Sequence, residues 1–568
     1  MTLLARVQPR RAFGFAAAAA ALLLAPFILP PYPLALLTLA LVYGLFAFGL
    51  DIAWGRAGIV SIGHAAFFGA GAYGWAFAVR HGLPELVGAL GGILVAAIVA
   101  LLVGLVGLSR RALPSTMAIL TLALTLLFEQ VARSWIVVTN GSNGVIVPSR
   151  GLIPDFYVTA VSVLVVVALV WIVLLRGRWG RRFLAVNANP DRAAHLGIDV
   201  RATRLVAFVA SAVIAAIAGV LAAPVMGLVA PSSGGILLST QVLVWLAVGG
   251  RGSIIGAFVG AIVITMGQQY LGAALGSWYL LVLGVVFLLI VRFAPGGLVG
   301  VARRILRVRP HIAAAQDAHV QGSVRNGARR VPEIPADLPA LEITGVGKAF
   351  GATIVLDDVD LTVPAGQSLC IIGPNGAGKT TLLNVVAGDL DPSAGSVSIF
   401  GADATSWGIH RRARAGVGKV FQIPSVFTEL SPAQNLALAR SEALERRELP
   451  ESLRRFETDD ARAADALPLA DRRALELAVV LAWGPRVIIL DEPAAGLSHE
   501  ESVALARLLR AVLAESGATL VVIEHDMEIV RELADRVVVL ANGRVLTEGT
   551  LDEVSARDDV KRAYLGAI

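Results

Sequence analysis

Long apolar runs follow one another through the first 300 residues of the chain. They lie near residues 13–30, 34–54, 57–79, 86–108, 113–136, 157–175, 205–229, 236–250, 254–272 and 277–296. An α-helix needs about 20 apolar residues to cross roughly 30 Å of hydrocarbon. We therefore expect an α-helical polytopic membrane domain with about ten transmembrane helices. The runs 57–79 and 236–250 are the weakest, so eight crossings with two re-entrant segments are an alternative.

Arginines between the runs predict the orientation of the helices, because short loops rich in arginine stay in the cytoplasm. An inside N-terminus and ten crossings place most of these arginines inside, including the cluster at 176–182, whereas Arg80, Arg133 and Arg150 fall outside. The first run lacks a small-residue cleavage pattern, so we interpret it as a retained signal anchor. We expect a multi-pass protein of the cell (inner) membrane, surrounded by lipid, with both ends in the cytoplasm.

A different pattern begins at Leu341, where short Val, Ile and Leu strands alternate with helical stretches. This alternation is typical of an α/β domain with a parallel sheet. Between the two patterns, residues 303–338 lack apolar runs and contain prolines, which predicts a flexible tether. We therefore divide the chain into a transmembrane domain over residues 1–302, a cytoplasmic linker over 303–338 and a soluble α/β domain over 339–568.

Charge separates the same two halves. Residues 1–300 carry 18 Arg, no Lys and 6 acidic residues, whereas the remainder carries 30 basic and 36 acidic residues. The positive excess therefore lies between apolar runs and not on a soluble face, which argues against nucleic acid as a partner. A single cysteine, Cys370, excludes an intramolecular disulfide framework and a zinc site built from cysteines.

A glycine-rich phosphate loop provides the first chemical signal. The apolar strand at 368–372 leads into Gly373, Pro374, Asn375, Gly376, Ala377, Gly378, Lys379, Thr380 and Thr381, and an apolar helix follows. In such a loop the main-chain N–H groups surround the phosphates of ATP, and the lysine reaches the β and γ oxygens. The hydroxyl of Thr380 is then placed to bind Mg²⁺.

Two further buried strands end in residues suited to ATP hydrolysis. The strand at 487–490 ends in Asp491 and Glu492. We expect Asp491 to hold Mg²⁺ and Glu492 to polarise the attacking water. The strand at 519–523 leads to His525, for which we favour a catalytic contact with the γ-phosphate over a structural role.

Taken together, these motifs resemble an ATP-binding cassette (ABC) subunit over residues 341–568. The resemblance implies that Gln422 is a lid residue that senses Mg²⁺ and the γ-phosphate, and that Phe350 stacks on adenine. The segments DEPAAGL (491–497), IEHDM (523–527) and AYLG (563–566) are most similar to the G-type ATPase of branched-chain amino-acid importers.

The membrane half resembles the M-type permease of the same importers, through residues 35–73, 189–222 and 249–261. In the inside loop, Pro190 can begin a short helix and Gly197 can end it. By resemblance, residues 187–199 are the coupling helix that docks on an ATPase. The resemblance also implies a second permease, a second ATP-binding subunit and an extracytoplasmic substrate-binding protein, although a homodimer is an alternative.

One segment departs from the family pattern. The signature that precedes the helix before Asp491 reads Leu467-Pro-Leu-Ala-Asp471, where a Ser-Gly-Gly-Gln-like sequence is expected. Proline lacks the serine hydroxyl, and the carboxylate of Asp471 would repel phosphate. We therefore hypothesise two unequal ATP sites, in which the site completed by this signature is weak.

The function that these features predict is ATP-driven uptake of a small molecule, with branched-chain or other hydrophobic amino acids as the substrate. Urea, amides or aromatic acids are alternative substrates. An exporter or a membrane-anchored regulatory ATPase fits less well, because of the ten short crossings and because Glu492 and His525 indicate turnover. Among polar residues near the apolar runs, we expect Asp51 and Glu129 to be solvated at helix ends. For His64 we favour packing among helices over a ligand site.

Overall fold

A computed structural model describes residues 19–306 and 338–565, apart from residues 21, 110–112, 114, 277, 295, 446 and 459–461. The chain divides into two compact units: Met1–Asn187 with Arg201–Ile312, and Ala188–Val200 with Ala313–Ile568. The short segment Ala188–Val200 therefore belongs with the C-terminal unit, although its neighbours in the sequence lie in the N-terminal one. Most of the predicted linker, 307–337, lies outside the described residues.

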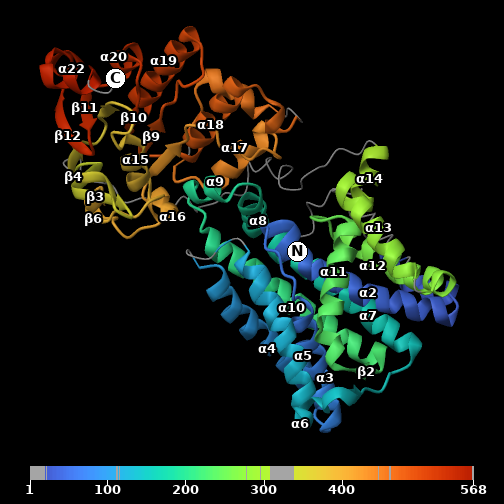
Figure 1. Ribbon diagram of the computed structural model, residues 1–568. Helices are drawn as coiled ribbons and strands as arrows, with labels where there is room; N and C mark the ends of the chain where they lie inside the picture. Colours follow the sequence, from blue (N-terminus) through green and yellow to red (C-terminus); the bar gives the residue numbers. More distant parts are fainter. Residues whose placement is uncertain are drawn as a thin grey trace. The chain divides into compact units, whose positions relative to one another are not determined.

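The N-terminal unit is helical (Figure 1). Its elements are α2 (Pro31–Asp51) with a π-helical turn (Ile52–Arg56), α3 (Ala65–Arg80), α4 (Glu85–Gly107), α5 (Thr116–Ser134), α6 (Ile136–Thr139), α7 (Leu152–Val170) with a second π-helical turn (Trp171–Leu175), α8 (Arg178–Ala188), α10 (Val200–Met226), α11 (Ile236–Gly249), α12 (Ile254–Leu275), α13 (Trp278–Phe293) and α14 (Gly297–Ile305). The strands β1 (Val145–Ile146) and β2 (Leu228–Val229) form a small antiparallel pair.

Six helices among the described residues are long and apolar enough to cross a membrane. They span Pro31–Arg56, Glu85–Gly107, Thr116–Ser134, Leu152–Leu175, Val200–Met226 and Ile254–Gly272. Three other predicted runs form shorter apolar helices, α3, α11 and α13, of 16, 14 and 16 residues. In the first predicted run, 13–30, residues 13–18 and 21 lie outside the described residues, and residues 22–28 are helical. The run 57–79 differs from the expectation, because its helix begins only at Ala65.

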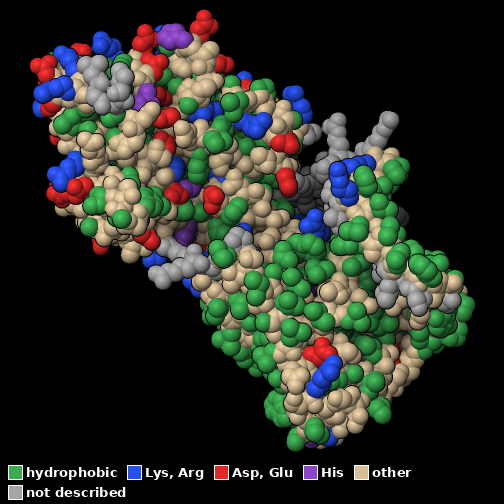
Figure 2. All heavy atoms as spheres, in the orientation of Figure 1, with side chains coloured by type: hydrophobic (Ala, Val, Ile, Leu, Met, Phe, Trp, Pro, Cys, Tyr) green, Lys and Arg blue, Asp and Glu red, His purple; other side chains and the backbone are tan. Residues whose placement is uncertain are grey.

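Helix α2 lies at the centre of this unit, where it packs against α7, α11 and α12. Small residues allow close helix approach, as in other membrane proteins. A Cβ atom at Gly71 of α3 would lie 2.0 Å from the carbonyl oxygen of Ala216 of α10. Many large apolar side chains of α4 and α7 are exposed, and Figure 2 shows hydrophobic side chains over the visible surface of this unit. These exposed faces suit contact with lipid.

The expectation for Asp51 is wrong, whereas that for His64 is confirmed. Asp51 is fully buried, and its carboxylate accepts hydrogen bonds from the Arg56 side chain (3.1 Å) and the Gly252 amide (2.6 Å). A buried carboxylate needs such partners, and the π-helical turn after Asp51 carries one of them. The ring of His64 stacks on Phe46 and meets the edge of Phe67. Glu129 pairs with Arg133, one helical turn later.

The C-terminal unit contains two sheets. A six-stranded sheet has the order β12-β11-β5-β10-β9-β8, and a four-stranded antiparallel sheet has the order β4-β3-β6-β7. The strands are β3 (Leu341–Phe350), β4 (Thr353–Val363), β5 (Ser368–Ile372), β6 (Ala394–Ile399), β7 (Ala402–Asp403), β8 (Val417–Val420), β9 (Val487–Asp491), β10 (Thr519–Ile523), β11 (Arg536–Ala541) and β12 (Arg544–Gly549). In the larger sheet, β11, β5, β10, β9 and β8 run parallel. The predicted α/β domain with a parallel sheet is confirmed.

Helices connect and cover these strands (Figure 1). They are α9 (Pro190–His195), α15 (Lys379–Ala387), α16 (Ile409–Arg414), α17 (Pro432–Ser441), α18 (Leu469–Trp483), α19 (His499–Ser516), α20 (Met527–Leu533), α21 (Leu551–Ala556) and α22 (Asp558–Leu565). Strands β5, β9 and β10 are buried at every residue, as their unbroken Val, Ile and Leu runs predict. Because they run parallel, the residues that follow them gather at one edge of the sheet, where ligands bind in such folds.

Candidate active site and the α9 contact

The phosphate loop follows β5 and leads directly into α15. Its glycines adopt conformations that other residues rarely take: Gly376 and Gly378 have φ angles of 80° and 97°. A Cβ atom at Gly373 would lie 2.1 Å from the carbonyl oxygen of Leu540, so no larger residue fits there. The loop therefore has the backbone form and the helix N-terminus that bind phosphate groups.

Lys379 and Thr380 begin α15 beneath this loop. The Lys379 ammonium donates to the carbonyl oxygens of Gly373 (2.8 Å) and Pro374 (2.9 Å), and burial lowers its pKa. The Thr380 hydroxyl donates to the Asp491 carboxylate at 3.4 Å. A hydroxyl and a carboxylate side by side next to a phosphate loop fit Mg²⁺, which takes its other ligands from phosphate and water. The phosphate loop, Lys379, Thr380 and Asp491 thus come together.

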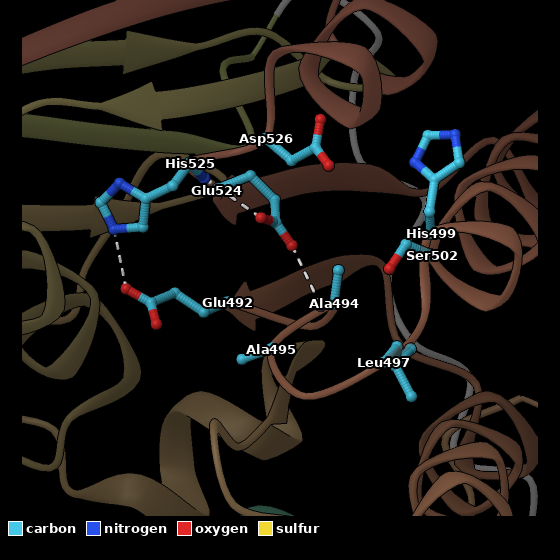
Figure 3. A pocket seen from close by; sticks show the side chains of 9 residues that line it. All are labelled: Glu492, Ala494, Ala495, Leu497, His499, Ser502, Glu524, His525 and Asp526. Atoms are coloured by element: carbon cyan, nitrogen blue, oxygen red, sulfur yellow. Dashed lines mark hydrogen bonds and ion pairs between the residues drawn. The ribbon is translucent and has the colours of Figure 1, made fainter.

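Glu492 lies between the two other expected catalytic side chains. Its Oε2 accepts a hydrogen bond from Gln422 Nε2 at 3.0 Å. Its Oε1 lies 2.9 Å from His525 Nε2, as Figure 3 shows. Three segments that are far apart in the sequence, after β8, β9 and β10, thus meet at one carboxylate. Glu492 has a φ angle of 47°, an uncommon conformation for a non-glycine residue that is often found at functional sites.

The loop after Glu492 is held by groups that the sequence did not indicate. The Glu524 carboxylate accepts hydrogen bonds from the amides of Ala494 (3.0 Å) and His525 (3.1 Å), and burial raises its pKa. From α18, Arg473 donates to the carbonyl oxygens of Gln422 (2.7 Å) and Pro493 (2.5 Å). Arg473 therefore ties the Gln422 segment to the Glu492 segment.

Helix α9 packs within the C-terminal unit, against α16 and β8. It begins at Pro190, with Asn189 as its N-cap, and Gly197 follows its end with a φ of 78°. This confirms the predicted short helix. The Asn189 amide also donates to the Ser425 hydroxyl at 3.0 Å, and the Arg414 guanidinium donates to the Gly197 carbonyl at 2.8 Å.

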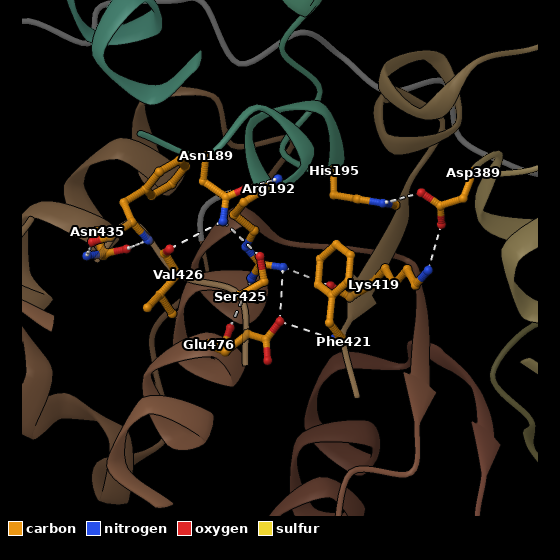
Figure 4. A network of polar contacts seen from close by, with 11 residues as sticks. Asn189, Arg192, His195, Asp389, Lys419, Phe421, Ser425, Val426, Asn435 and Glu476 are labelled. Carbon is orange, nitrogen blue, oxygen red and sulfur yellow. Dashed lines mark hydrogen bonds and ion pairs between the residues drawn. The ribbon is translucent and has the colours of Figure 1, made fainter. Parts of the chain in front are cut away.

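A buried ion pair lies at the centre of the α9 contact. Arg192 and Glu476 are both fully buried, and Arg192 Nη1 lies 3.6 Å from Glu476 Oε1 (Figure 4). Arg192 Nη1 also donates to the Lys419 carbonyl at 2.9 Å. Burial raises the pKa of Glu476 to about 7, and the charge of Arg192 opposes this rise. The same Oε1 accepts the amide of Phe421 at 3.1 Å, one residue before Gln422.

A second set of polar groups anchors the other end of α9. The ring of His195 packs edge-on against Phe421, and its Nε2 lies 3.1 Å from Asp389. Burial lowers the pKa of His195, so a neutral ring that donates from Nε2 fits this contact. Lys419 donates to the same carboxylate at 2.6 Å. Buried polar groups on α9 thus find partners on several elements of the C-terminal unit.

Phe350 and the signature segment 467–471, which departs from the family pattern, lie apart from these contacts. Phe350 ends β3 with about half of its surface exposed, and the Lys348 ammonium lies 5.2 Å from its ring centre. Helix α18 begins at Leu469, with Pro468 at the N-cap position and no side-chain cap. The Asp471 carboxylate pairs with Arg455 at 2.7 Å, which partly offsets its negative charge.

Sequence reasoning missed Arg192, Glu476, Arg473 and Glu524. One signal was present for Glu476: it lies among Leu475, Leu477 and Ala478 in the apolar part of a helix, where a charged residue needs a buried partner. Its partner could not be found in the same way, because Arg192 lies 284 residues earlier in the chain.

Known protein families match both halves of the chain. Residues 32–291 match the family described as branched-chain amino acid transport system / permease component, and residues 356–495 match the ABC transporter family. The high-affinity branched-chain amino acid transport ATP-binding protein BraF of Pseudomonas aeruginosa is 33% identical over 250 residues, which cover 40% of this chain and 98% of that protein. Its counterpart LivG of Escherichia coli is 32% identical over 250 residues, with the same coverage.

Other relatives share the ATP-binding half. The methionine import ATP-binding protein MetN of Leifsonia xyli is 36% identical over 244 residues, 40% of this chain and 71% of that protein. A solved nucleotide-free ATP-binding cassette from an ABC transporter is 25% identical, with a TM-score of 0.36, over 40% of this chain and 98% of that one. The chain belongs to the ABC transporter family and joins a permease domain and an ATP-binding domain, related to those of branched-chain amino acid transport, in one polypeptide.

Proposed function

We propose that this chain is the permease and ATP-binding subunit of an importer that uses ATP hydrolysis to take up branched-chain or other hydrophobic amino acids across the inner membrane. The observation that carries the proposal is the position of α9. This helix lies in the sequence between two apolar spans, α7 and α10, yet it packs in the ATP-binding unit beside the segment that bears Gln422. A change at Gln422 thus has a direct route to the permease helices.

Each residue of the site has a part in the proposed mechanism. Lys379 and the loop amides bind the β and γ phosphates of ATP, and Phe350 stacks on adenine. Thr380, Asp491 and Gln422 would hold Mg²⁺, which would neutralise phosphate charge. Glu492 polarises the attacking water, and His525 orients Glu492 and contacts the γ-phosphate.

Coupling follows from the contacts around Gln422. Gln422 bonds to Glu492, and the preceding amide, that of Phe421, bonds to Glu476, which pairs with Arg192 of α9. A shift of Gln422 toward a bound nucleotide therefore moves a group on which α9 is docked. The predicted cytoplasmic linker, residues 303–338, keeps both domains in one chain during this cycle.

The substrate class rests on similarity, because relatives are named for branched-chain amino acids and one for methionine. Charged side chains are few on the apolar spans, which favours a hydrophobic solute over a charged one. Urea, amides and aromatic acids are the alternatives within the same machine. A working unit needs two permeases and two ATPases, so the partners are a second permease, a second ATP-binding subunit and an extracytoplasmic binding protein.

ATPase activity of the assembled transporter in proteoliposomes tests this function. We expect vanadate-sensitive hydrolysis that rises when a leucine-loaded binding protein is added outside, and no rise with the unloaded protein. The Glu492→Gln variant should bind ATP and lose hydrolysis. A rate of ATP hydrolysis that does not change when the loaded binding protein is added would favour a regulatory ATPase without transport.

A further inference from the structure

The backbone leaves the helical form between α2 and α3. After the π-helical turn Ile52–Arg56, residues Gly58–His64 are not helical, and α3 begins at Ala65. Gly58 and Val60 of this segment are exposed, the latter by 41%, whereas Ile59 and Ser61 are buried. Non-helical backbone at membrane depth is tolerated only where it is buried in protein or lines a water-filled cavity.

The segment reaches membrane depth at Ile62 and His64, which contact residues of the candidate spans α5 and α10. The Ile62 amide donates to the hydroxyl of Thr121 on α5 (3.1 Å), and the Ala65 amide donates to that of Ser239 on α11 (3.0 Å). His64 Nε2 lies 3.3 Å from the hydroxyl of Ser211, near the middle of α10. A Cβ atom at Gly58 would lie 2.7 Å from Asn187 Oδ1 of α8, so the segment extends from the α8 side of this unit toward the middle of α10.

Several buried polar atoms around this segment have no hydrogen-bond partner. They are Ser61 Oγ, Thr125 Oγ1 and His64 Nδ1, each on a fully buried residue of the described chain. A Cβ atom at Gly63 would lie 2.4 Å from Thr125 Oγ1, so this hydroxyl points at the segment. An unsatisfied buried polar group destabilises the structure, and a ligand with matching groups would recover that cost.

The pattern of these atoms indicates the ligand. The Ser211 hydroxyl donates its proton to the Gly49 carbonyl at 2.6 Å, so it can only accept from His64 Nε2–H. The other ring nitrogen, Nδ1, is then an acceptor in need of a donor. The hydroxyls of Ser61 and Thr125 can donate, and the N-terminus of α3 favours negative charge. Donors and an acceptor together suit a carboxylate and an ammonium group.

We propose that Gly58–His64 lines the path of the solute through the permease and binds the zwitterionic end of an amino acid. Ser61 and Thr125 donate to its carboxylate, and His64 Nδ1 accepts from its ammonium group. The apolar residues Val60 and Ile62 border the same segment. This inference rests on the proposed function, and it assigns the amino-acid class to particular residues.

Reactivity of a cysteine at Val60 tests the path. In a Cys370→Ala background, Val60→Cys is treated in native membranes with a positively charged, membrane-impermeant methanethiosulfonate. The matched control is Val161→Cys, because Val161 is 48% exposed near the middle of α7. We expect modification at position 60 to be at least tenfold faster than at position 161. Leucine-loaded binding protein together with ATP should slow the modification at position 60. Equal rates at the two positions, or no modification at 60, would overturn the proposal.

Two hydroxyl variants test the binding groups in the same Val60→Cys chain. Thr125→Val should raise the leucine concentration needed for protection about tenfold. Thr38→Val is the control, because Thr38 is buried but already bonded to the Leu34 carbonyl. Equal protection by leucine in Thr125→Val and Thr38→Val would refute the proposed binding site. Protection by urea or an amide in place of leucine would refute the amino-acid class and leave the path intact.

Discussion

Removing the buried charge of Arg192 should release α9 from the ATP-binding unit. Arg192 and Glu476 are fully buried, and each keeps its charge out of water only because the other is present. Loss of one member of a buried pair costs about 3–5 kcal/mol. Since about 1.4 kcal/mol corresponds to a factor of ten, the docking equilibrium of α9 in Arg192→Ala should fall by a factor of roughly 100 to 4,000.

A disulfide across the contact measures this docking. Asn189 Nδ2 lies 3.0 Å from Ser425 Oγ, so Asn189→Cys with Ser425→Cys in a Cys370→Ala chain places two thiols within reach. We expect rapid cross-linking in this parent and much slower cross-linking after Arg192→Ala. The exposed arginine Arg507 on α19 provides the control, because Arg507→Ala should cross-link like the parent.

Reversal of both charges distinguishes the effect of the ion pair from the effect of lost packing. Arg192→Glu with Glu476→Arg should recover part of the cross-linking that either single change removes. The same double variant should recover part of the ATPase stimulation by loaded binding protein. Cross-linking of Arg192→Ala at the rate of the parent would refute the reasoning, because docking would then not depend on the pair.

Three other predictions concern the ATP-binding unit. His525→Ala should lower kcat at least tenfold with little change in ATP affinity, because His525 contacts Glu492, and this is measured by steady-state hydrolysis and nucleotide binding. Since burial raises the pKa of Glu476 from 4.5 to about 7, its protonated form stabilises the folded unit, and this stability should decline by roughly 3 kcal/mol as the pH rises from 4.5 to 7. Thermal unfolding across this range should show a smaller decline in Glu476→Gln than in the parent. Finally, Lys379→Ala should abolish most ATP hydrolysis by the assembled transporter. Replacement of the phosphate-loop lysine in the partner ATPase should leave most hydrolysis intact. Equal losses of hydrolysis in the two variants would contradict the hypothesis of unequal ATP sites.

The local chemistry of the ATP site could be predicted from the sequence, because each motif is a short segment with its own strand. The loop at Gly373, the pair Asp491–Glu492 and the residue His525 all follow buried strands whose apolar runs are plain. Parallel pairing of those strands then places the motifs at one edge. The contact between Gln422 and Glu492 follows from the same rule, since Gln422 comes just after β8.

Contacts that depend on tertiary packing could not be predicted. The Arg192 and Glu476 side chains come from different domains in the sequence, and no local pattern pairs them. In the membrane unit, hydropathy does not distinguish Gly58–His64 from a helix, because its residues are mostly apolar or small. The burial of Asp51 was missed for a related reason: its partner amide, at Gly252, is 201 residues away.

Uptake of labelled leucine tests the central claim most directly. Cells that lack their own systems would express this chain with its partner permease, ATPase and binding protein, either as wild type or as Glu492→Gln. The account predicts concentrative uptake by the wild type and its loss in the variant, with equal amounts of protein in the membrane. Equal uptake by both would contradict the claim that hydrolysis at Glu492 drives transport.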